Sequence, residues 1–127
     1  MKERAKELKA EKEAKSKEQD EAAVLEKISE MKDADRAMAT SIHEIVKAVA
    51  PQLTSRLWYG SPAYAKDGKV VCFFQDSNKF KTRYATLGFS DEAALDDGTM
   101  WPSSYALTDV TPVVEKQIRD VVTRAVG

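Results

Sequence analysis

With 127 residues, 43% of them hydrophobic and 32% charged, the chain has the size and composition of one globular domain. Its net charge of −1 argues against general nucleic-acid binding, and its single cysteine, Cys72, excludes an internal disulfide and a cysteine-based zinc site. No apolar stretch is long enough to span a bilayer, and the N-terminal end lacks the apolar core of a secretory signal, so we expect a cytoplasmic protein.

Charge is concentrated at the N-terminal end of the chain. Residues 1–36 hold ten Lys or Arg and eleven Asp or Glu, more than half of all the charged residues. Residues 1–20 are rich in good helix formers but have almost no apolar side chain to bury. We therefore expect residues 1–34 to be a charged extension, helical or disordered, and residues 35–127 to form the domain.

From Val24 onward, apolar residues recur at steps of three and four. The pattern is interrupted where Asp35 occupies an expected apolar position. This spacing predicts two helices, near residues 21–32 and 35–50. Asp33 or Asp35 is expected to cap the second of them.

The middle of the chain has the pattern of antiparallel strands. Asp67-Gly68 between two strand-like runs is a strong hairpin signal. Lys69–Gln75 is apolar on both faces, as is typical of a central strand. Further strands are expected at Ser55–Tyr59, Ala63–Lys66, Phe80–Phe89 and Ser104–Leu107, with a bend at Gly60-Ser61-Pro62.

Two more helices are expected after the strands. Ser90 followed by two acidic residues is typical of a helix start, and so is Thr111-Pro112 near the C-terminal end. The whole order predicts an α+β fold. We expect an antiparallel sheet of four or five strands with the N- and C-terminal helices packed on one face.

Few residues indicate chemistry by themselves. His43, the only histidine, is expected to be an exposed or half-exposed helical side chain rather than a metal ligand or a base. Cys72 is expected to be an inert core thiol. One dense acidic group is expected to hold structural charges, with a weak cation site as the alternative: Asp91, Glu92, Asp96 and Asp97.

Aromatic and basic residues suggest a binding site. The candidate ligand-binding residues are Trp58, Tyr59, Gly60, Pro62, Tyr64, Lys81, Arg83 and Trp101. Lys81 and Arg83 are two apart on the expected strand, so they would share a face and meet an anionic group beside the rings. The alternative is that the rings are ordinary core residues and that the two cations protect an edge strand.

Several motifs occur together over about three-quarters of the chain. They are Ala50-Pro51, Trp58-Tyr59-Gly60 with Pro62-Ala63-Tyr64, Lys69–Phe74, Lys79-Phe80-Lys81, Arg83–Phe89 and Trp101-Pro102. In this combination, residues 35–126 resemble the YdhG-like family of small bacterial proteins, with Ser61 where the family commonly has Met. The resemblance implies a frataxin-like α-β-α two-layer sandwich and the function of an intracellular iron chaperone, but it identifies no iron ligands in this chain.

Two classes of function follow from these observations. The favoured one is a binding module that carries a small ligand or a metal such as iron, or that binds a partner protein. The alternative is a small enzyme that acts on an anionic molecule in an aromatic-lined pocket, for which a strongly shifted pKa in a cleft would be evidence. No cofactor and no catalytic residue is indicated, and we expect a monomer or a weak dimer.

Overall fold

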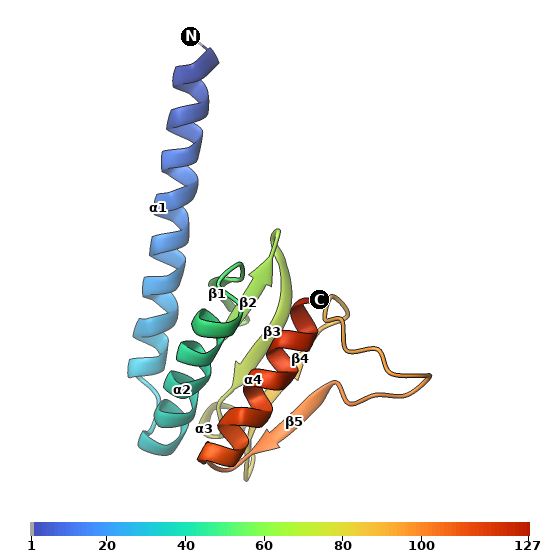
Figure 1. Cartoon of the computed structure of the whole chain (residues 1–127). Helices are drawn as coiled ribbons and strands as arrows, with labels where there is room; N and C mark the ends of the chain where they lie inside the picture. The colour runs from blue at the N-terminus through green and yellow to red at the C-terminus, as the bar shows by residue number, and fades with distance from the viewer. Residues whose placement is uncertain (1) are drawn as a thin grey trace.

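The computed structural model describes residues 2–127, and side chains from Ser16 onward. Its helices are α1 (Lys2–Ser29), α2 (Asp33–Val49), the short α3 (Ser77–Phe80) and α4 (Pro112–Val126). Its strands are β1 (Thr54–Trp58), β2 (Ser61–Lys66), β3 (Lys69–Gln75), β4 (Ala85–Phe89) and β5 (Ser104–Leu107). The strands form one antiparallel sheet in the order β1-β2-β3-β4-β5, which confirms an α+β fold with helices at both ends (Figure 1).

Two-residue turns join the first three strands. Tyr59-Gly60 has φ angles of 52° and 75°, and Asp67-Gly68 has φ angles of 52° and 81°. Two successive positive φ angles are typical of type I′ turns, whose twist matches that of the flanking strands. The hairpin predicted at Asp67-Gly68 is confirmed. The other turn lies at Tyr59-Gly60 and closes the pair Trp58–Ser61, one residue earlier than the expected bend.

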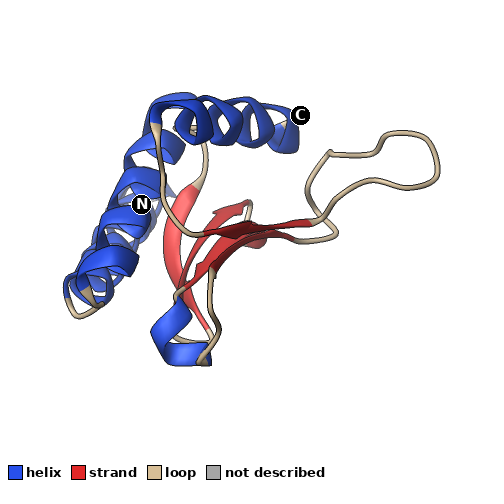
Figure 2. Ribbon diagram, turned by 90° about the horizontal axis from the view of Figure 1, so that it is seen from below, coloured by secondary structure: helices blue, strands red, loops and turns tan. Residues whose placement is uncertain are grey.

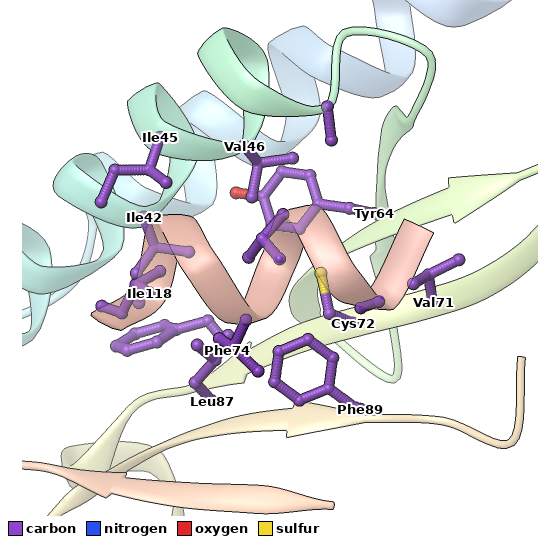
Figure 3. Close-up of a cluster of buried hydrophobic side chains, with 14 of the residues drawn as sticks. Ile42, Ile45, Val46, Tyr64, Val71, Cys72, Phe74, Leu87, Phe89 and Ile118 are labelled. Atoms are coloured by element: carbon purple, nitrogen blue, oxygen red, sulfur yellow. The ribbon is translucent and has the colours of Figure 1, made fainter. Parts of the chain in front are cut away.

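The two faces of the sheet have different surroundings. α2 and α4 pack against each other on one face, and α1 packs against β1 and β2; Figure 2 shows α4 over the sheet and α3 on its other side. Buried side chains from the strands fill the space beneath the helices, among them Tyr64, Cys72, Phe74, Leu87 and Phe89 (Figure 3). Because side chains alternate along a strand, Trp58 and Phe73 lie on the opposite face, where neither α2 nor α4 packs.

α1 is one continuous helix, and its C-terminal part belongs to the core. Val24 and Ile28 of α1, and Met31 just after it, are buried with the residues of the following elements. The packed unit therefore begins before residue 35. Side chains 16–20 are exposed, and the expectation of little apolar burial over residues 1–20 otherwise falls outside the described side chains. No helix of the described chain is long and apolar enough to cross a membrane.

The segment before β4 corrects the strand predicted over Phe80–Phe89. β4 begins only at Ala85, because the preceding residues form α3. Asp76 caps α3 by accepting a hydrogen bond from the Lys79 N–H at 3.0 Å, and Lys81 ends it with a φ of 52°. A local polar cap therefore overrides the strand propensity of this segment.

The helix expected at Ser90 is not formed. Residues 90–103 are a long connection that projects beyond the sheet between β4 and β5 (Figure 1). The Ser90 hydroxyl donates to the Val70 carbonyl and accepts from the Glu92 N–H at 3.2 Å. Ser90 thus anchors the start of this connection to β3 instead of opening a helix.

Docking of α1 can be tested with two substitutions on the same helix. Ile28→Ala should lower the free energy of unfolding by about 2–5 kcal/mol, because it removes a buried side chain from the core. Leu25→Ala is the matched control, since Leu25 is 48% exposed, and its effect should stay within about 0.5 kcal/mol. Urea denaturation measures both values. Equal effects of the two substitutions would show that α1 is not docked.

Candidate functional site

Three aromatic rings and one lysine gather at the β1–β2 turn. The Trp58 ring centroid lies 5.1 Å from that of Phe73 and 5.0 Å from that of Tyr59. Trp58 and Phe73 are half-buried, whereas Tyr59 is 84% exposed. We refer to Trp58, Tyr59, Phe73 and Lys79 as the turn cluster.

Gly88 provides the floor of the turn cluster. It is paired with Phe73 across β3 and β4. A Cβ atom at Gly88 would lie 2.3 Å from the Phe73 ring, so only glycine allows this ring to rest directly on the backbone of the sheet. The Phe73 ring in turn supports the Trp58 ring that packs against it.

Lys79 brings a positive charge to the turn. Its Nζ donates to the Tyr59 carbonyl oxygen at 2.8 Å. Gly60 is favoured here by its positive φ, and a Cβ atom at this position would lie 2.6 Å from the same Nζ and displace the lysine. Tyr59 itself has a positive φ, which is uncommon for a bulky residue. The Lys79 bond therefore holds the backbone that presents the exposed ring of Tyr59.

Ser61 places a hydroxyl next to the rings. It is paired with Trp58, so both side chains lie on the same face of the sheet. Ser61 is 3% exposed, and its Oγ has no hydrogen-bond partner among the described residues. Burial of an unpaired hydroxyl is unfavourable. Because the Oγ atom itself is buried, a ligand at the turn cluster would reach it only if the surrounding side chains moved.

The structure separates the residues predicted to form one concavity. Trp58, Tyr59 and Gly60 lie together at the turn cluster. Pro62 and Tyr64 alternate with Ser61 and Ala63, so their side chains lie on the helix-covered face and are buried in the core. For Tyr64, the alternative of ordinary core packing is the one observed.

The expected cations and the second tryptophan also lie elsewhere. Lys81 and Arg83 belong to the connection between α3 and β4, which corrects the expectation that they share a strand face. The Arg83 guanidinium lies over the Tyr84 ring, 5.3 Å from its centroid. Trp101 is in the connection that leads into β5, at the opposite edge of the sheet from β1 (Figure 1). Ligand binding by these residues stays a prediction.

A buried polar network joins α1, α2 and β2. His43 is 5% exposed, which corrects the expectation of an exposed side chain. Its Nε2 lies 3.2 Å from a Glu21 carboxylate oxygen, and its Nδ1 lies 3.0 Å from the Tyr64 hydroxyl. Since a carboxylate can only accept, Nε2 donates to Glu21. Both ring nitrogens of His43 therefore have a hydrogen-bond partner.

Lys47 completes the network by donating to the same Glu21 oxygen as His43. The bond from Lys47 lowers the pKa of Glu21, with a further contribution from His43, against the opposing effect of burial. Burial raises the pKa of Tyr64 well above its usual range, so its hydroxyl remains a donor. Burial also raises the pKa of Cys72 to about 12, which keeps this core thiol protonated.

Asp35 links α2 to α3, a role that the sequence analysis missed. It is buried, and its carboxylate accepts from the Ser77 Oγ at 2.9 Å, the Ser77 N–H at 3.3 Å and the Asn78 N–H at 3.2 Å. The residue that caps α2 is Lys32, without a side-chain bond, so neither Asp33 nor Asp35 is the expected cap. The sequence did contain a signal for this role, because Asp35 occupies a position where the spacing of the helix predicts an apolar residue.

Within the described part of the chain, no group of three or more His, Cys, Asp or Glu residues comes together to hold a metal ion. In the acidic group predicted near residue 91, Glu92 lies 3.8 Å from the Lys69 ammonium. Comparisons of the chain with protein-family models, with curated proteins and with solved structures give no match.

The ion pair of Glu21 predicts a dependence of stability on pH. Because the pKa of Glu21 is lowered in the folded state, its contribution is complete above the ordinary carboxyl value of 4.5 and is lost as the pH falls through the lower folded value. The difference in Tm between the wild type and Glu21→Gln should therefore be largest near neutral pH and shrink below pH 4.5. Thermal unfolding followed by circular dichroism at several pH values measures it.

Glu44→Gln is the matched control, because it removes the same charge from an exposed position on α2. If the Tm difference between the wild type and Glu21→Gln does not change with pH, the Glu21 carboxylate does not have this stabilising role.

Proposed function

We propose that this protein is a cytoplasmic binding module and that the turn cluster binds a small anion that carries a planar ring. One observation carries the proposal. The Tyr59 ring is 84% exposed and is held at a positive φ beside Trp58, by a backbone that is itself bonded to the Lys79 ammonium. An exposed ring in an uncommon backbone conformation is typical of a functional position.

The groups around the turn suit both parts of such a ligand. A planar ring would stack on Tyr59 or Trp58, as bases stack on aromatic side chains in other proteins. Lys79 has N–H donors in addition to the one used by Tyr59, and these would meet the anionic group. Arg56 lies two residues before Trp58, is exposed on the same face and would add a second cation.

Binding is favoured over the enzyme alternative by the positions of the shifted pKa values. The described groups whose pKa values clearly shift are Glu21, Tyr64 and Cys72. Their shifts are explained by the buried network and by the core. None of the three belongs to the turn cluster, where an enzyme acting on the same ligand would need a tuned acid or base.

We further propose that the chain is a YdhG-like protein with a frataxin-like arrangement. The proposal is supported by the motifs of the sequence and by the packing of α2 and α4 together on one side of an antiparallel sheet. An iron-carrier function has no candidate ligand set among the described residues, whereas an organic anion has the turn cluster. We therefore favour the organic anion.

Adenosine monophosphate is a suitable probe of this proposal, with adenosine and inorganic phosphate as its two parts. In a Trp101→Phe background, Trp58 is the only tryptophan and reports binding by fluorescence. We expect saturable quenching by adenosine monophosphate and weaker binding of each part. Tyr59→Ala should weaken binding by roughly tenfold through loss of stacking. Arg56→Gln should weaken the binding of adenosine monophosphate but not that of adenosine.

Lys69→Gln is the control for Arg56→Gln, since it removes an exposed cation at the Asp67-Gly68 turn. Circular dichroism would verify that all variants remain folded. Equal affinities for adenosine monophosphate and adenosine, or an unchanged affinity in Tyr59→Ala, would contradict the proposal.

A further inference from the structure

A cleft lies between α4 and the edge of the sheet. α4 packs against α2 and β3, and the strand order places β4 and β5 beyond it. The cleft has a volume of about 390 Å³, which is within the range of sites for small organic molecules. Its lining comes from α4 and from the side of β4 and β5 that faces the helices, whereas the turn cluster lies on the other face of the sheet. The two are separate places on the molecule.

The floor of the cleft is apolar and continuous with the core. Leu87 of β4, Leu107 of β5, and Ile118 and Val121 of α4 line it, and all four are buried. Side chains in a close-packed core have fixed positions. The floor is therefore preformed, and an apolar molecule placed on it would be removed from water without rearrangement of the protein.

The rim of the cleft is polar. Gln117, Asp120 and Arg124 recur at steps of three and four along α4, so they share one side of the helix and line the cleft. Tyr105 lines the opposite wall from β5. Within the described residues Arg124 makes no ion pair, whereas Arg119, the other arginine of α4, pairs with Glu115 at 2.9 Å.

We propose that this cleft binds a small carboxylic acid with an apolar body, independently of the ligand of the turn cluster. The Arg124 guanidinium, the Gln117 amide and the Tyr105 hydroxyl can all donate to a carboxylate, and a guanidinium does so through two parallel bonds. Asp120 is the one rim side chain that can only accept, so its charge opposes the acid and limits the affinity. The apolar body of the ligand lies on the floor.

Three probes with the same alkyl chain test the choice of head group: octanoate, octanol and octylammonium. Calorimetric titration of the full chain should give the tightest binding for octanoate. Arg124→Gln should lower the affinity for octanoate by roughly tenfold, because the charged hydrogen bonds are lost. Asp120→Asn should raise this affinity, because it removes the opposing charge. Arg119→Gln is the matched control and should bind octanoate like the wild type.

A blocked cleft identifies the place of binding. Gln117→Trp puts a large ring at the entrance from an exposed position and should abolish octanoate binding, while the neighbouring Lys116→Trp should not. No octanoate binding, equal or tighter binding of octylammonium, weaker binding in Asp120→Asn, or unchanged binding in Gln117→Trp would each overturn the proposal. Adenosine monophosphate titrations of Gln117→Trp would show that the turn cluster is unaffected and keep the two proposals distinct.

Discussion

Two turns with positive φ angles set the arrangement on which the rest of the structure depends. Tyr59-Gly60 and Asp67-Gly68 each close a hairpin with two residues; together with a register shift between Tyr64 and Ala65, they fix how β1, β2 and β3 are paired. A shift of one residue would move every side chain of a strand to the other face. The Tyr64 hydroxyl would then leave His43, and the Trp58 ring would enter the core. Register thus decides both which residues stabilise the fold and which are available to a ligand.

The same short motif serves both purposes because its residues alternate. Trp58, Ser61 and Ala63 lie on the uncovered face with Phe73, whereas Pro62 and Tyr64 lie on the helix-covered face. The buried half is stabilised by hydrogen bonds that join α1, α2 and β2. On the uncovered side, the Trp58 ring and the buried Ser61 hydroxyl lie next to the exposed Tyr59 ring, whose carbonyl oxygen accepts from Lys79 of α3. Substitutions on the uncovered face can therefore change what is bound there without disturbing the core on the other face.

Features that depend on neighbouring residues could be predicted from the sequence, and features that depend on distant partners could not. The Asp67-Gly68 hairpin, the central strand Lys69–Gln75 and the helix start at Thr111-Pro112 are local, and they are observed. α3 was missed although its cap, Asp76, is local; its further bonds come from Asp35, far away in the chain. For the candidate site, the Trp58-Tyr59-Gly60 region was identified, but Lys79 was not, because its contact with Tyr59 exists only once α3 has formed.

The length and continuity of α1 have a mechanical consequence. It leaves the body as an uninterrupted helix whose base is held by Val24, Ile28 and Glu21 (Figure 1). At about 1.5 Å per residue, the stretch from Lys2 to Asp20 is about 28 Å long. A helix anchored at its base acts as a lever, and each inserted residue would turn everything ahead of it by about 100°. Whatever contacts the far end of α1 is therefore presented at a defined distance and direction from the sheet.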